Sequence, residues 1–192
     1  MNIGITGGIG VGKSVVSKII ELMGYNVFNS DFEAKSLINK DPLIKDQLIK
    51  LLGKEIYKNS ILNKEVMAEK IFSNNETRKL VNEIVHPRVR DSFALFASKQ
   101  KNNIAFNESA ILFETGSYKE FDKIILVTSP MYLRVSRIIN RDKCSKQELD
   151  AKISSQWDDN TKIPLADFVI LNDEKEPIIN QIEIVLNQLT SV

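Results

Sequence analysis

One short segment constrains this chain more than any other. Residues 7–14 read GGIGVGKS and fit the pattern G-x-x-x-x-G-K-[ST] in full. An apolar run, Asn2–Thr6, precedes the segment and predicts a short buried strand. A helical pattern over residues 13–23 follows it and ends at Gly24, which is suited to a helix C-terminus. A glycine-rich turn that only packs a helix on a sheet is the alternative, and the strand–loop–helix context favours a phosphate-binding loop.

Such a loop binds phosphates through backbone N–H groups, and the helix dipole adds positive potential there. We expect Lys13 to reach the β- and γ-phosphates of ATP and the Ser14 hydroxyl to bind Mg²⁺. The residues expected to contact the nucleotide are Gly8, Ile9, Gly10, Val11, Gly12, Lys13, Ser14 and Val15.

Further apolar runs alternate with helical patterns, which predicts an α/β fold with three layers and a five-stranded parallel sheet covered on both faces. The remaining predicted strands are residues 26–28, 104–106, 124–127 and 168–171, and a last helix is predicted near 177–189. The long helical stretch at about 32–100 exceeds one crossover and predicts a helical insertion within a single 1–192 domain. A polar, basic stretch at about 130–164 predicts a lid.

The bulk composition narrows the possible partners. The chain has 26 Lys and Arg against 25 Asp and Glu, and this balance disfavours a nucleic-acid partner. The single cysteine, Cys144, excludes a disulfide framework and is expected to have no catalytic role. No run of about 18 apolar residues predicts a membrane span, and no signal peptide is visible, so a cytoplasmic location is expected.

Several side chains could act in phosphoryl transfer. Asp31 follows the second strand, where ligands collect in parallel sheets, although a helix N-cap is an equally good interpretation. Arg134, Arg137 and Arg141 are spaced to share one helix face in the lid. His86 precedes Pro87, which is expected to interrupt a helix.

Carboxylates and an absent motif complete the set of candidates. Glu108 and Glu114 flank an apolar segment after the third strand, and Glu108 either holds Mg²⁺ through water or is a solvent-exposed strand end. No Asn-Lys-x-Asp motif follows an apolar strand, which disfavours a GTPase.

These residues together resemble the dephospho-CoA kinase family from residue 1 to about 175. The resemblance lies in Gly4–Ser14, in Val85-His86-Pro87, and in the segment 109–114 that ends in Glu114. It continues in the R-x-x-x-R-D pattern of residues 137–142, in Gln156 and Lys162, and in the string 166–172. Residues 26–31 are similar to the family's segment that ends in D-A-D, whose second Asp falls on Asp31 and whose first falls on Asn29, a departure. Further departures are Ala110, Val15 and the acidic stretch 157–160.

The resemblance implies transfer of the γ-phosphate of ATP to the ribose 3′-hydroxyl of dephospho-CoA, with Mg²⁺ and without an obligate protein partner. It implies that Asp31 accepts the hydroxyl proton while Lys13, Arg137 and Arg141 neutralise the transferred charge. His86 and Glu114 would join Asp31 in binding the acceptor. The alternatives are a P-loop kinase for another acceptor such as a nucleoside monophosphate, a regulatory nucleotide switch, and an inactive nucleotide-binding module.

Overall fold

The computed structural model describes residues 1–72, 74–143 and 145–191, so Cys144 lies outside the described residues. The described chain forms two compact units, one of residues 1–29 with 97–192 and one of residues 30–96. No helix in the described part of the chain is both long and apolar enough to cross a bilayer.

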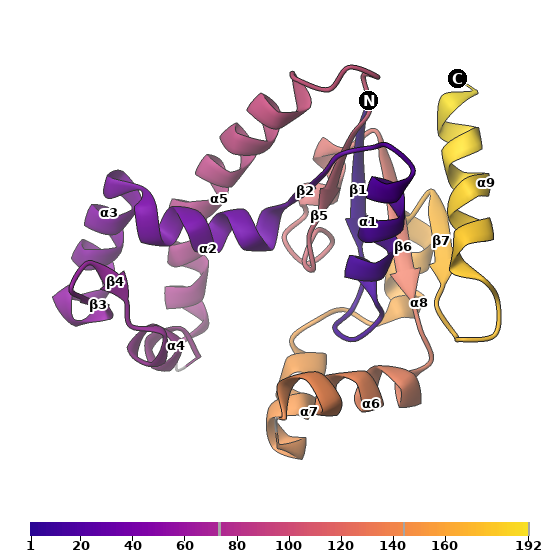
Figure 1. The fold of residues 1–192 in the computed structure, drawn as a ribbon. Helices are drawn as coiled ribbons and strands as arrows, with labels where there is room; N and C mark the ends of the chain where they lie inside the picture. Colours follow the sequence, from indigo (N-terminus) through magenta and orange to yellow (C-terminus); the bar gives the residue numbers. More distant parts are fainter. Residues whose placement is uncertain (73, 144, 192) are drawn as a thin grey trace. The chain divides into compact units, whose positions relative to one another are not determined.

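The first unit is built on a sheet of five parallel strands in the order β2-β5-β1-β6-β7 (Figure 1). Its strands are β1 (Asn2–Thr6), β2 (Val27–Asn29), β5 (Ala105–Glu108), β6 (Lys123–Thr128) and β7 (Phe168–Leu171). Its helices are α1 (Lys13–Leu22), α6 (Met131–Asp142), α7 (Lys146–Ser154), α8 (Asp159–Lys162) and α9 (Ile178–Thr190), with 3-10 turns at Ser117–Glu120 and Ile163–Leu165. The fold class predicted from the sequence is therefore confirmed.

Alternate residues of β6 enter two different apolar clusters, which explains why both faces of the sheet are dry. Ile125 and Val127 pack in one cluster with residues of α1 and α9. Ile124 and Leu126 pack in the other with Leu112 and its neighbours. A strand buried on both faces must be apolar throughout, and this is the pattern that the sequence of β6 carries.

The second unit consists of α2 (Ser30–Lys40), α3 (Pro42–Leu52), α4 (Lys64–Phe72) and α5 (Asn75–Ala97), of which Ala97 belongs to the first unit. A 3-10 turn (Lys54–Ile56) and a two-stranded hairpin of β3 (Tyr57–Lys58) and β4 (Ile61–Leu62) lie between α3 and α4. The sequence predicted only helices in this stretch, so the hairpin is a correction. Its turn residues Asn59 and Ser60 both have positive φ, and Asn tolerates that conformation better than most residues do.

Helix α5 runs through Pro87 without a break, which corrects the predicted interruption. Buried residues recur every fourth position along this helix, at Val81, Val85, Val89 and Phe93. This apolar stripe supplies the burial that stabilises a helix in spite of one missing backbone hydrogen bond.

Candidate active site

The loop between β1 and α1 adopts a conformation that only glycine accommodates easily at Gly12. Gly12 has φ of 95°, and a Cβ there would collide with the side-chain amide of Asn172. That amide donates to Val11 O at 2.8 Å, so Asn172 fixes the second half of the loop against the end of β7. The predicted context of the motif is confirmed, because β1 ends at Thr6 and α1 begins at Lys13.

The Lys13 side chain turns back over the loop that precedes it. Its ammonium donates to Gly7 O at 2.8 Å and to Gly8 O at 3.3 Å. These carbonyls lie in the first half of the loop, so the positive charge is held there. Ser14 and Val15 are exposed at the first turn of α1, where a hydroxyl can meet a ligand.

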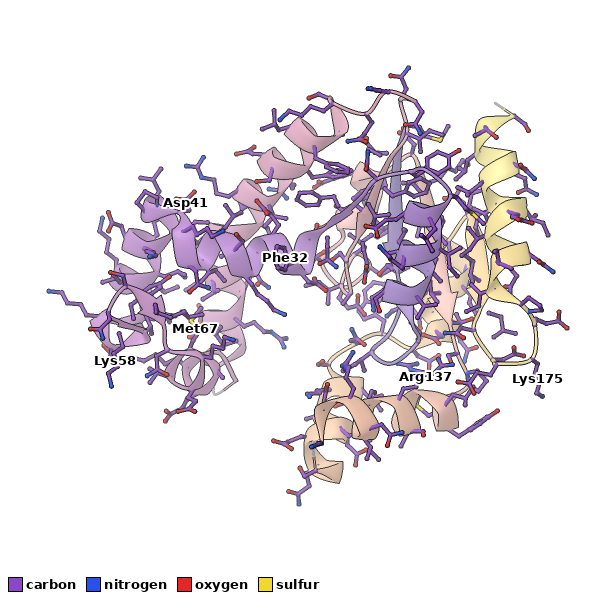
Figure 2. The ribbon with its side chains drawn as sticks, in the orientation of Figure 1. Phe32, Asp41, Lys58, Met67, Arg137 and Lys175 are labelled. Atoms are coloured by element: carbon purple, nitrogen blue, oxygen red, sulfur yellow. The ribbon has the colours of Figure 1, made fainter. Side chains whose placement is uncertain are left out.

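The three arginines of α6 divide into two groups. Arg134 and Arg137 both contact the phosphate-binding loop: Arg134 Nε donates to Ile9 O at 2.9 Å, and Arg137 NH1 donates to Gly10 O at 3.3 Å. Figure 2 shows Arg137 between α6 and the carboxyl end of the sheet, and its other nitrogen donates to Glu174 at 2.8 Å. Arg141 is exposed and donates to Asp142 through Nε and NH2, at 2.6 and 3.1 Å.

Helix geometry explains why Arg141 differs. It lies seven residues after Arg134, so it is about 10 Å farther along the helix axis although it points in nearly the same direction. Hydrogen bonds from Arg141 and then Lys152 hold the pKa of the Asp142 carboxyl far below its usual range. Arg141 thus belongs to an ion-pair group at the C-terminal end of α6.

Two carboxylates lie at the end of β5 and in the loop that follows it. Glu108, the last residue of β5, is buried, and its Oε2 accepts from Asn29 Nδ2 at 3.4 Å. The Oε1 atom of Glu114 accepts from the Trp157 backbone N–H at 2.9 Å and lies 2.8 Å from Lys162 Nζ. Glu114, expected as an acceptor-binding residue, therefore holds the segment that precedes β7 in this structure.

The contact between Lys162 and Glu114 is a buried ion pair. Lys162 is fully buried and the Glu114 side chain is 12% exposed. Their atoms meet at 2.8 Å without the angles of a hydrogen bond, and within the described part of the chain Lys162 Nζ has no hydrogen-bond partner. The attraction is therefore electrostatic, in a place where water does not weaken it.

Sequence reasoning missed the roles of Asp159 and Asp167. Asp159 Oδ2 lies 3.4 Å from Arg134 NH1, and burial raises the pKa of this carboxyl although Arg134 opposes the shift. Asp167 accepts from Lys123 Nζ and from Ile124 N, both at 2.8 Å. Burial would raise the pKa of Asp167, but the hydrogen bond from Lys123 and that from the backbone of Ile124 outweigh it and lower the pKa.

The other predicted site residues belong to the second unit. Asp31 lies in the first turn of α2, two residues beyond β2, and is half-buried. Helix α2 begins at Ser30, so Asp31 is inside the helix and is not its N-cap. His86 is half-buried on α5, directly before Pro87.

The family model for dephospho-CoA kinase (CoaE) matches residues 1–177 of this chain. A dephospho-CoA kinase of Bacteroides fragilis is 43% identical over 183 residues, which cover 95% of this chain and 89% of that protein.

The chain belongs to the dephospho-CoA kinase family.

Solved structures share the fold of this chain. A crystal structure of a Thermus thermophilus protein is 28% identical with a TM-score of 0.85, and the match covers 100% of this chain and 96% of the other. The dephospho-CoA kinase of Campylobacter jejuni, 24% identical, has the same fold with a TM-score of 0.71 over 99% of this chain and 97% of its own. The resemblance found in the sequence is confirmed, and membership in this kinase family implies the use of ATP.

Proposed function

We propose that this chain transfers the γ-phosphate of ATP to the ribose 3′-hydroxyl of dephospho-CoA. The residues of its phosphate-binding loop and Asp31 are proposed to catalyse the reaction. The observation that carries the proposal is the loop between β1 and α1, with Lys13 held over its first half, in a chain of the dephospho-CoA kinase family. The backbone N–H groups of the loop would cradle the phosphates, and Lys13 would exchange its carbonyl partners for phosphate oxygens.

Asp31 is proposed to accept the proton of the attacking hydroxyl. It follows β2 by two residues, and β2 is the neighbour of β5 at the edge of the sheet. In parallel sheets ligands bind beyond the carboxyl ends of strands, which supports a role at the reacting centre. Arg137, close to the loop, is better placed than the exposed Arg141 to neutralise charge, and Arg141 would have to leave Asp142 to do so.

The oxygen donors near the loop suit a magnesium ion. Ser14 offers an exposed hydroxyl, and Glu108 offers a carboxylate at the end of β5, the neighbour of β1. Mg²⁺ is usually held by one or two such oxygens together with phosphates and waters, and no cluster of three metal-binding side chains occurs in the described residues. We propose that Ser14 holds the ion directly and Glu108 through water; bound there, it would withdraw charge from the phosphates.

The second unit is proposed to bind the acceptor through His86, and Glu114 of the first unit is proposed as a further acceptor-binding residue. His86 lies on the longest helix of the chain's described part, and Glu114 lies in the loop after β5. The proposal for these two residues depends on the family resemblance of their sequence segments, Val85-His86-Pro87 and residues 109–114. His86→Ala is expected to raise the KM for dephospho-CoA more than the KM for ATP.

Acceptor profiling tests the function. ADP release from ATP and Mg²⁺ is measured with dephospho-CoA, AMP, CMP, shikimate or no acceptor. Release stimulated by dephospho-CoA alone supports the proposal, and Lys13→Ala should abolish that stimulation. Stimulation by AMP or CMP alone would leave a P-loop kinase and refute the proposed acceptor.

A further inference from the structure

The two peptide groups that flank the Ile9 Cα, in the first half of the phosphate-binding loop, are each held by a side chain. The Ile9 N–H donates to Gln156 Oε1 at 2.7 Å. Its carbonyl accepts from Arg134 Nε at 2.9 Å. The N–H belongs to the peptide group that joins Gly8 to Ile9, and the carbonyl belongs to the one that joins Ile9 to Gly10. Because each peptide group is planar, a hydrogen bond to each restricts their rotation about the Ile9 Cα. Neither side chain has a role in the proposed chemistry.

Arg134 is placed for this contact at some energetic cost. It is only 6% exposed, although a charged side chain is rarely buried unless it is paired. Asp159 supplies the pairing at 3.4 Å. The guanidinium also packs directly on Gly8, where a Cβ would collide with it. Arg134 therefore contacts Gly8 and the carbonyl of Ile9 from one side of the loop.

Gln156 is fixed at its other end as well. Its Nε2 donates to Ala110 O at 3.4 Å, and the next residue, Trp157, donates its backbone N–H to Glu114. Residues 156–162, which we call the strap, are tied again where Lys162 meets Glu114. The strap thus connects the Ile9 backbone N–H to the loop that follows β5.

The two halves of the phosphate-binding loop are held by different groups. Arg134 and Gln156 hold the first half, and Asn172 holds the second half through Val11 O at 2.8 Å. The Lys13 ammonium lies over the first half, because its acceptors are Gly7 O and Gly8 O. A P-loop lysine reaches the β- and γ-phosphates, so the first half of the loop is the part that we expect to lie beside the terminal phosphate.

We propose that Gln156 and Arg134 are positioning residues, which orient the two peptide groups on either side of the Ile9 Cα so that the first half of the loop and Lys13 meet the γ-phosphate. The proposal rests on the nucleotide site of the proposed function and adds to it a determinant of ATP over ADP preference. A group that must be held in one orientation to meet a ligand loses affinity when its supporting contacts are removed.

The test is nucleotide binding in the presence of Mg²⁺ and without an acceptor, measured by titration calorimetry. Gln156→Met keeps the volume of the side chain and removes both hydrogen bonds. It should raise the Kd for ATP about tenfold and the Kd for ADP less than about threefold. Gln147→Met changes an exposed glutamine of α7 in the same way and should alter neither Kd.

A second variant tests the hydrogen bond to the Ile9 carbonyl. Arg134→Lys keeps a positive charge for Asp159 and loses the planar guanidinium, so it should also raise the Kd for ATP more than the Kd for ADP. Because both side chains hold the backbone of one residue, Ile9, the double variant should lose less than the sum of the two single effects. Trp157, the only tryptophan in the chain, reports by its fluorescence that the strap is still folded.

The outcomes separate this proposal from the proposed function. Equal weakening of ATP and ADP, or no weakening of either nucleotide by Gln156→Met and Arg134→Lys, would overturn the positioning role. Binding is measured without an acceptor, so a wrong acceptor would leave the result unchanged. If Lys13→Ala also left ATP affinity unchanged, the nucleotide site itself would be refuted.

Discussion

Replacing Lys162 with methionine should strongly destabilise this fold, although it leaves the volume of the core unchanged. Lys162 is fully buried, and its ammonium lies 2.8 Å from Glu114 Oε1. Methionine fills the same space without the charge. Within the described residues, Glu114 Oε1 then keeps the hydrogen bond from the Trp157 N–H at 2.9 Å and loses its only cation.

The magnitude follows from the burial of the pair. Removing one partner of a buried ion pair leaves an uncompensated charge and typically costs about 3–5 kcal/mol. For a chain of this length each kcal/mol lowers the melting temperature by roughly 2–4 °C, so the expected loss is about 6–20 °C. Thermal unfolding followed by circular dichroism and by Trp157 fluorescence measures it.

An exposed ion pair elsewhere in the chain provides the matched control. Lys18 and Glu21 lie 3.1 Å apart on α1 with side chains that are 67% and 41% exposed. Lys18→Met should cost at most about 1 kcal/mol, because water and salt screen that pair. Adding Glu114→Gln to Lys162→Met should recover part of the loss, since no charge is then left unpaired. A Lys162→Met variant that melts within a degree or two of Lys18→Met would refute this reasoning.

Three more predictions concern the reaction, the pH dependence of stability and the loop. Asp31→Asn should lower turnover by orders of magnitude and change ATP affinity only a few fold; near-normal turnover in a coupled assay would reduce Asp31 to a structural residue. The pKa of Asp167 is lowered from its ordinary 3.8, so its bond with Lys123 stabilises the fold above that pH, and the stability is lost as pH falls through the lower folded value. As the pH falls below 3.8, the free energy of unfolding measured with urea should therefore decrease less steeply for Asp167→Asn than for the wild type. Parallel plots of this free energy against pH would contradict the pKa shift. Gly8→Ala should raise the Kd for ATP at least about tenfold in titration calorimetry, because the new Cβ must displace the Arg134 guanidinium. An unchanged Kd would show that the loop tolerates this displacement.

Local pattern predicted the sheet well because each strand carries its own signal. β1 and β7 have the predicted bounds, since both are short apolar runs closed by residues that end strands. The hairpin of β3 and β4 was missed because two-residue strands have too few positions for a periodicity. The local signal for this hairpin is its two-residue turn, Asn59–Ser60, in which both residues have positive φ. Asn followed by Ser indicates such a turn less strongly than Asn followed by Gly does.

Some features of the site could likewise be predicted from the sequence and others could not. The phosphate-binding loop was predicted because its chemistry lies in consecutive residues. The contact of Gln156 with Ile9 joins residues 147 positions apart, and that of Arg134 with Ile9 joins residues 125 positions apart. No local pattern encodes such a partner. The spacing of the α6 arginines predicted a common face, but it could not reveal that only the first part of the helix reaches the loop.

The most direct test of the account follows the γ-phosphate of ATP itself. ATP labelled in that phosphate is incubated with the enzyme, Mg²⁺ and dephospho-CoA, and the products are separated and identified by mass spectrometry. The account predicts that the label appears in CoA as a phosphate on the ribose 3′-hydroxyl, with little label in inorganic phosphate. Label found in inorganic phosphate alone, with dephospho-CoA unchanged, would contradict it.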